Sequence, residues 1–152
     1  AEIKSVANVP GLTDIHFHGC MGHDFCDGTA EAFDAIAEYE FHQGVTTICP
    51  ATMTLPSENL SEILRSAAAY REEQISGRIS GEPEEPFSGK VSGEQKEPIS
   101  EKGFGDGRSE LVGIHLEGPF LSKNKRGAQK EAYLQLPSAE KLRRWQEDAL
   151  FC

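Results

Sequence analysis

The chain is organised around the segment Gly11-Leu12-Thr13-Asp14-Ile15-His16-Phe17-His18-Gly19. Its apolar residues Leu12, Ile15 and Phe17 give it the β-favouring character of a buried strand. His16 and His18 are two residues apart, and side chains at that spacing on a strand point to the same side. Two imidazoles that converge at the end of a strand form half of a metal site. The alternative is that one histidine caps a turn and the other is a hydrogen-bonded core group, but the paired spacing favours the metal site.

The length and charge of the chain restrict what it can bind. Its 152 residues are enough for one domain with its own core. The formal net charge of −10 argues against nucleic acid as a partner and leaves no basic surface for an anionic membrane. The chain contains no run of 18 apolar residues, so the sequence predicts no transmembrane helix. We expect the chain to be a piece of a longer one, because it lacks an initiator methionine and ends at Leu150-Phe151-Cys152.

The cysteines indicate a reducing compartment. The four of them form no C-x-x-C pair, and no secretory signal precedes them. We therefore predict reduced thiols in a cytoplasmic protein. Cys20 follows the two histidines closely and is open to metal chemistry, although a small buried apolar role is more common for a free cysteine.

Helical and β-branched segments alternate along the chain. We predict a loop over residues 19–28, helices over 29–43, over 57–74 and from Ser138, and strands over 45–49 and 111–116. Strands separated by amphipathic helices imply parallel pairing with right-handed crossovers. Polar groups at the strand ends favour an α/β fold that forms part of a (β/α)₈ TIM-type barrel, its first three βα units. A small doubly wound sheet is the alternative, but no G-x-G-x-x-G or P-loop supports it.

Residues 75–110 interrupt this pattern. The segment repeats Ser-Gly and Glu-Pro units and has few large apolar residues, so it cannot bury enough surface to offset its chain entropy. We predict a disordered insertion in a surface loop within a single partial barrel domain, residues 1–152. The alternative is a functional lid, because long loops are sometimes functional.

A second pair of polar residues lies at the end of the apolar segment over residues 111–116. His115 and Glu117 repeat the spacing of His16 and His18 at the end of residues 111–116. A carboxylate at the end of a buried strand is costly unless it is paired, hydrogen-bonded or bound to a metal. Glu117 is therefore a candidate partner for the two histidines.

Two motifs together carry a family resemblance: Pro10-Gly11-Leu12-Thr13-Asp14-Ile15-His16-Phe17-His18-Gly19 and Gly113-Ile114-His115-Leu116-Glu117-Gly118-Pro119-Phe120-Leu121. With them the chain resembles the N-acetylglucosamine-6-phosphate deacetylase family of the amidohydrolase superfamily. The first motif marks only the superfamily, and the second is more specific to the deacetylases. Four shorter segments also match: Gly22-His23-Asp24, Asp27-Gly28-Thr29, Gly44-Val45-Thr46-Thr47 and Gly127-Ala128-Gln129.

The resemblance implies a distorted TIM barrel with metal at the carboxyl ends of the strands. It implies that Glu117 is a metal ligand and that His16 and His18 hold a second metal where one is bound. The cofactor would be one or two divalent ions, Zn²⁺ or Fe²⁺, and the ligand types do not choose between them. Ala128 and Gln129 match a loop that touches the sugar, although many family members have His at the position of Gln129.

The implied reaction is hydrolysis of N-acetylglucosamine 6-phosphate to glucosamine 6-phosphate and acetate. The family takes its general base, an Asp, and further metal-binding histidines from later strands that this chain does not contain. We therefore assign no catalytic base to this chain. We also expect the full-length enzyme to be a homodimer. The alternatives are another metal-dependent amidohydrolase, such as a cyclic amidase or a deaminase, and a non-catalytic remnant or interaction module.

Overall fold

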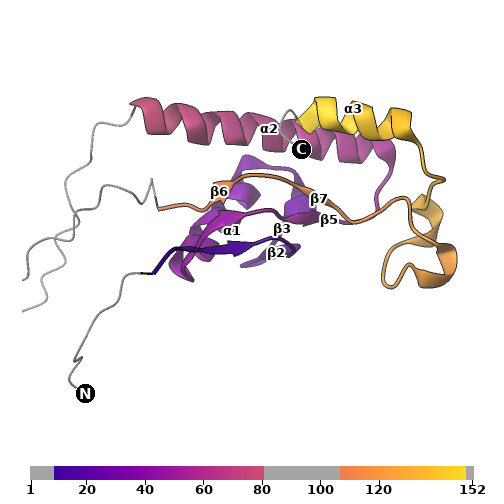
Figure 1. Cartoon of the computed structure of the whole chain (residues 1–152), viewed down its shortest axis with the longest axis horizontal. Helices are drawn as coiled ribbons and strands as arrows, with labels where there is room; N and C mark the ends of the chain where they lie inside the picture. Colours follow the sequence, from indigo (N-terminus) through magenta and orange to yellow (C-terminus); the bar gives the residue numbers. More distant parts are fainter. Residues whose placement is uncertain (1–8, 81–106, 150–152) are drawn as a thin grey trace, which may run out of the picture.

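Parallel strands alternate with helices in the computed structural model, which describes residues 9–80 and 107–149 (Figure 1). The main sheet, in spatial order, contains β1 (Leu12–Asp14), β4 (Val45–Ile48) and β6 (Glu110–Leu111). A second parallel pair follows it along the chain and consists of β5 (Ala51–Thr52) and β7 (His115–Leu116). The predicted α/β class with parallel strands is confirmed.

The two later predicted strands are each divided. The strand expected over residues 45–49 ends at Ile48, and β5 resumes after Pro50; residues 112–114 separate β6 from β7. Backbone hydrogen bonds nevertheless join the segments beyond the breaks: Cys49 N to Asp14 O at 2.8 Å, Ala51 N to Phe17 O at 2.7 Å and His115 N to Pro50 O at 2.9 Å. The carboxyl ends of the three strands therefore lie side by side, and they position the site.

The first strand is not buried as the sequence suggested. Leu12 is 62% exposed and Ile15 is 67% exposed, and only Phe17 of the three apolar residues packs against the core. The reason is that β1 is the edge of the sheet within the described residues, with β4 as its one sheet neighbour there.

The three helices are α1 (Ala30–His42), α2 (Ser57–Ser80) and α3 (Ala139–Ala149). The predicted helix over residues 29–43 is confirmed, because Thr29 Oγ1 accepts a hydrogen bond from Ala32 N at 3.2 Å and caps its start. Gly44 ends it with a φ of +86°. α2 and α3 lie side by side over the strands (Figure 1). None of the helices in the described ranges is long and apolar enough to cross a membrane.

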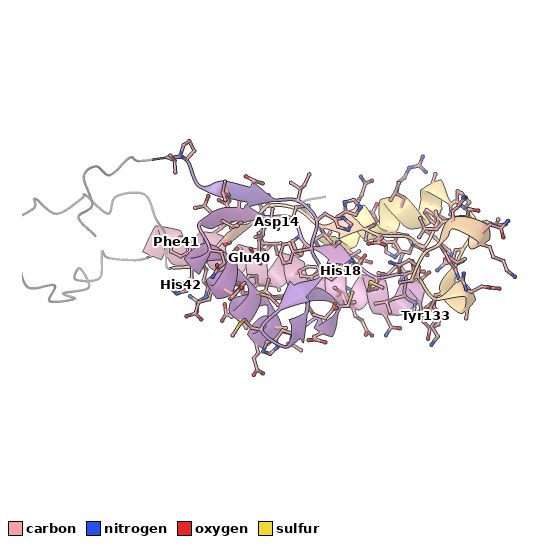
Figure 2. The ribbon with its side chains drawn as sticks, turned by 90° about the horizontal axis from the view of Figure 1, so that it is seen from below. Asp14, His18, Glu40, Phe41, His42 and Tyr133 are labelled. Atoms are coloured by element: carbon pink, nitrogen blue, oxygen red, sulfur yellow. The ribbon has the colours of Figure 1, made fainter. Side chains whose placement is uncertain are left out.

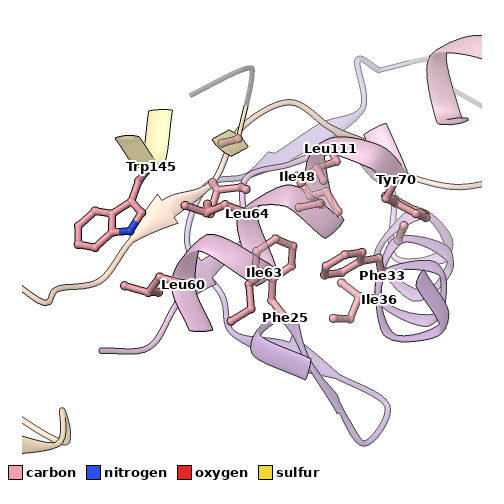
Figure 3. Close-up of a cluster of buried hydrophobic side chains, with 14 of the residues drawn as sticks. Phe25, Phe33, Ile36, Ile48, Leu60, Ile63, Leu64, Tyr70, Leu111 and Trp145 are labelled. Carbon is pink, nitrogen blue, oxygen red and sulfur yellow. The ribbon is translucent and has the colours of Figure 1, made fainter. Parts of the chain in front are cut away.

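The core joins the helices to the sheet. Its largest buried side chains come from the 3₁₀ helix η1 (Phe25–Asp27), from α1 and α2, from the strands and from α3. Figure 3 shows them in one cluster: Phe25, Phe33, Ile36, Ile48, Leu60, Leu64, Leu111 and Trp145. Leu142, on the same helix as Trp145, is 43% exposed. Burial of this apolar area holds α1 and α2 against the sheet.

The segment over residues 19–28 is more ordered than a loop. It forms an antiparallel pair, β2 (Gly19–Cys20) and β3 (His23–Asp24), followed by the 3₁₀ helix η1 (Phe25–Asp27). The two turn residues, Met21 and Gly22, both have positive φ, of 54° and 86°. That combination allows a two-residue hairpin turn, which a count of Gly and Asp alone does not reveal.

The predicted insertion over 75–110 is shorter than expected at both ends. Residues 75–80 continue α2, Ser109 donates through its hydroxyl to Val45 O at 2.7 Å, and Glu110 begins β6. The reason is a buried anchor at Gln74, whose side chain donates to Ser109 O at 3.1 Å and accepts from Leu111 N at 3.2 Å. The rest of the segment, residues 81–106, lies outside the described residues.

Candidate metal centre

Three ligand-type side chains meet where the strands end. His16 and His18 follow β1, and Glu117 follows β7. Glu117 Oε2 lies 3.3 Å from His16 Nε2 and 3.1 Å from His18 Nε2. Each residue offers one ligand atom, and these atoms all lie within 4.8 Å of one another. The structure therefore brings together the three residues that the sequence singled out as metal ligands, and Figure 2 shows His18 at this position.

The ring of His18 is oriented by the main chain. Its Nδ1 lies 3.1 Å from the carbonyl oxygen of Ala51 in β5. A carbonyl oxygen only accepts hydrogen bonds, so Nδ1 is the nitrogen that donates to Ala51 O. Nε2 is then the nitrogen that faces Glu117, the arrangement of a histidine that binds a cation through Nε2 while its other nitrogen donates to a carbonyl.

His16 is the more open member of the cluster. Its side chain is exposed, and its ring packs edge-on against the rings of His18 and His115, with centroids 5.5 Å and 4.6 Å away. Its backbone N donates to Asp14 Oδ1 at 3.0 Å, which fixes the chain as it leaves β1. His115 contacts the cluster through this ring contact, and its nitrogens are not among the three grouped ligand atoms.

The second oxygen of Glu117 is already bonded. Gln129 Nε2 donates to Glu117 Oε1 at 2.6 Å, and Gln129 Oε1 accepts from Thr54 N at 2.7 Å. Gln129 is only 3% exposed, whereas the neighbouring Ala128 is exposed. Of the two residues that we expected to touch a sugar, the structure thus places one on the surface and the other against the Glu117 carboxylate.

Gly118 allows this arrangement. Its φ is +90°, and a Cβ built on it would lie 2.1 Å from Thr54 Oγ1. Thr54 uses the space to donate through Oγ1 to the carbonyl oxygen of Glu117 at 3.0 Å. The glycine after Glu117 in the sequence motif therefore has a structural cause, since any side chain there would displace Thr54.

The nearby cysteines do not join the cluster. Burial raises the pKa of the Cys26 thiol to about 11, and Met53 N donates to its sulfur at 3.1 Å. Burial, and secondarily the Glu40 carboxylate, raises the pKa of Cys20. The ligand group found among the described residues contains His16, His18 and Glu117 and neither of these two thiols. The structural role that we favoured for Cys20 is consistent with this.

Two contacts that shape the site could not be predicted from the sequence. The bond from His18 to the Ala51 carbonyl depends on the pairing of strand ends, and the bond from Gln129 to Glu117 depends on a loop that returns to β7. His23, from one of the shorter segments that match the family, lies in β3 and is not part of the ligand group found among the described residues.

The geometry defines a parallel α/β protein with a His-x-His pair and a Glu at its strand ends, the class that includes the metal-dependent amidohydrolases. No protein-family model matches the chain. Curated relatives do: the N-acetylglucosamine-6-phosphate deacetylase of Bacillus subtilis is 27% identical over 151 residues, which cover 97% of this chain and 31% of the relative. That of Mus musculus is 30% identical over 128 residues, 82% of this chain and 24% of the relative.

Solved structures give the same match. The N-acetylglucosamine-6-phosphate deacetylase of Thermotoga maritima superposes with a TM-score of 0.63 and 30% identity, covering 89% of this chain and 28% of that one. A mutant of the Mycobacterium smegmatis enzyme superposes with a TM-score of 0.67 and 20% identity, covering 99% of this chain and 32% of that one. That structure is a complex with N-acetyl-D-glucosamine-6-phosphate. The chain is a homologue of the N-acetylglucosamine-6-phosphate deacetylases. It spans between a quarter and a third of the length of these relatives.

Proposed function

We propose that this chain is part of an enzyme that hydrolyses N-acetylglucosamine 6-phosphate to glucosamine 6-phosphate and acetate, and that it supplies metal ligands to that enzyme. The observation that carries the proposal is the convergence of His16 Nε2 and His18 Nε2 on Glu117 Oε2, at 3.3 Å and 3.1 Å. The likeness to deacetylases over most of this chain supports the choice of substrate. The substrate would be a small phosphorylated sugar, and the acidic net charge disfavours nucleic acid as a partner.

The donor set fits a divalent cation. Two imidazole nitrogens and one carboxylate oxygen are ligands that both Zn²⁺ and Fe²⁺ accept, and the proposal covers either metal and one or two ions. The orientation of His18 by Ala51 O supports the fit, because it turns Nε2 toward the other two ligand atoms. A bound divalent cation supplies an activated water and polarises the acyl oxygen of an amide, which otherwise resists hydrolysis at neutral pH.

The residues of this chain then have distinct roles. His16, His18 and Glu117 hold the cation, and Ala128, exposed in the loop after β7, contacts the sugar. The general base and the remaining ligands would come from the part of the fold that the relatives have and this chain does not span. We further propose a homodimer located in the cytoplasm, in agreement with the free cysteines.

Acetate release tests the proposal. The natural protein that carries these residues, loaded with Zn²⁺ or Fe²⁺, should release acetate from N-acetylglucosamine 6-phosphate, and Glu117→Gln should remove that activity. The 152-residue chain alone should release none, because general acid–base catalysis, commonly worth about 10²–10⁴ in rate, has no residue assigned to it here.

Two other outcomes would replace the proposal. Turnover of a cyclic amide or an amino-substituted ring, with no acetate from the sugar phosphate, would identify a different amidohydrolase. A folded natural protein that binds metal and turns over none of these substrates would indicate a non-catalytic module.

A further inference from the structure

We propose that Gln129 is a positioning residue for the metal centre, which holds Glu117 so that one carboxylate oxygen faces the two histidines. This inference rests on the proposed function, because it concerns the same site. It differs from the expectation that Gln129 touches the sugar: in the structure its amide is buried against protein groups.

The first step is that both ends of the Gln129 amide are used. Nε2 donates to Glu117 Oε1 at 2.6 Å, and Oε1 accepts from Thr54 N at 2.7 Å. A buried amide with both ends bonded has one favoured orientation, because a flip would set N–H against N–H and oxygen against carboxylate. The amide is therefore a fixed donor at the position of Glu117 Oε1.

The second step is what this donor does to the carboxylate. A charge-assisted hydrogen bond to Oε1 fixes the rotation of the carboxylate plane. Oε2 is then the oxygen left for His16 and His18, and it is the atom found 3.3 Å and 3.1 Å from their Nε2 atoms. Without the hydrogen bond from the Gln129 amide, the Glu117 carboxylate would rotate more freely. It would then lose this conformational entropy when it bound a cation.

The third step is that Thr54 completes a closed frame. Its backbone N–H holds Gln129, and its hydroxyl donates to the carbonyl oxygen of Glu117 at 3.0 Å. Thr54 comes just after β5, the strand whose Ala51 carbonyl orients His18. The same segment thus orients the carboxylate, through Gln129, and one imidazole, so the two ligands are fixed relative to each other.

Zn²⁺ binding by the natural protein tests the inference. We expect Gln129→Met, which keeps the length of the side chain but removes both hydrogen bonds, to raise the Zn²⁺ dissociation constant about 10–100-fold, the usual effect of losing a group that orients a ligand. Gln135→Met is the matched control. Gln135 is a half-buried amide later in the same segment that bonds Ser57 and Lys141, not Glu117, and its loss should leave Zn²⁺ affinity within about twofold.

A second variant and a measurement without substitution keep the test decisive if Gln129→Met does not fold. Gln129→Asn keeps the amide but is too short to span both partners, so it should also weaken Zn²⁺ binding. In the unsubstituted protein, the side-chain NH₂ resonances of Gln129 should shift on Zn²⁺ addition while those of Gln135 stay unchanged.

The outcomes separate this inference from the proposed function. If the unsubstituted protein and Glu117→Gln bind Zn²⁺ equally weakly, the metal site itself is wrong. If Glu117→Gln loses Zn²⁺ while folded Gln129 variants bind it as the unsubstituted protein does, or if the Gln129 resonances do not move, the positioning role is overturned.

Discussion

His18 Nδ1 lies 3.1 Å from the carbonyl oxygen of Ala51, so a backbone group of β5 orients the ring of a side chain that follows β1. The two segments are joined in the same place by the bond from Ala51 N to Phe17 O at 2.7 Å. The strand pairing therefore does more than hold the sheet together, because it turns His18 Nε2 toward Glu117 Oε2, 3.1 Å away.

From this relationship we predict that His18→Ala weakens Zn²⁺ binding by the natural protein at least about tenfold, because it removes a preoriented ligand. His42→Ala is the matched control, since His42 is exposed on α1 and pairs only loosely with Glu38, at 4.0 Å. Competition with a chromogenic zinc chelator measures both affinities. Equal loss in the two variants would show that the effect is not local to the site.

Cys26 should be slow to react with alkylating reagents. Burial is the largest cause of the shift that raises the pKa of the Cys26 thiol from 9.0 to about 11. At pH 8 about one thiol in a thousand is therefore ionised, instead of about one in ten. Iodoacetamide labelling at pH 8, followed by peptide mass spectrometry, should be about 100-fold slower at Cys26 than at a free cysteine. Labelling at the free-cysteine rate in the folded protein would contradict the buried placement.

The same raised pKa has a consequence for stability at alkaline pH. The thiol is protonated more strongly in the folded chain than in the unfolded chain, so its contribution is fully present below pH 9 and is lost as the pH rises through about 11. The free energy of unfolding should therefore fall more steeply over that range than in Cys26→Ala. Other groups titrate there too, so the difference between the two proteins is the quantity to compare.

Trp145 should be the main anchor of α3. It is 2% exposed and packs on Phe120, with ring centroids 5.6 Å apart. Phe120 follows closely after Glu117 in the sequence. We predict that Trp145→Ala lowers the free energy of unfolding by about 3–5 kcal/mol. Leu142→Ala, on the exposed side of the same helix, should cost less than about 1 kcal/mol. Urea denaturation followed by circular dichroism distinguishes the two.

The sequence predicted those parts of the fold that depend on local pattern. The capped helix α1 follows from the spacing of Phe33, Ile36 and Ala37 and from Thr29 before it. The metal cluster follows from the two-residue spacing of His16 and His18 after one apolar run and from Glu117 after another, because parallel strands bring their carboxyl ends to the same edge of a sheet.

What the sequence did not predict depends on contacts between distant segments. Ile15 is apolar but exposed because of where β1 sits in the sheet, which no periodicity encodes. The extension of α2 past residue 74 depends on the bonds from Gln74 to Ser109 and Leu111, more than thirty residues later. The position of Gln129 depends likewise on Thr54, far away in the sequence.

Glu117→Gln should keep the fold and lose the metal. The amide oxygen of the introduced side chain can still accept a hydrogen bond from Gln129 Nε2, so this buried hydrogen bond is kept. A neutral amide is a far poorer ligand for a divalent cation than a carboxylate. Glu62→Gln is the matched control, because it makes the same substitution at an exposed position on α2 outside the cluster.

The decisive measurement for the metal centre is the zinc content of the natural protein, determined by elemental analysis after purification with Zn²⁺ and removal of the excess. We expect bound zinc in the unsubstituted protein and in Glu62→Gln, and a zinc-to-protein ratio near zero in a Glu117→Gln variant whose circular dichroism spectrum is unchanged. An unchanged zinc-to-protein ratio in folded Glu117→Gln would contradict the assignment of His16, His18 and Glu117 as a metal centre.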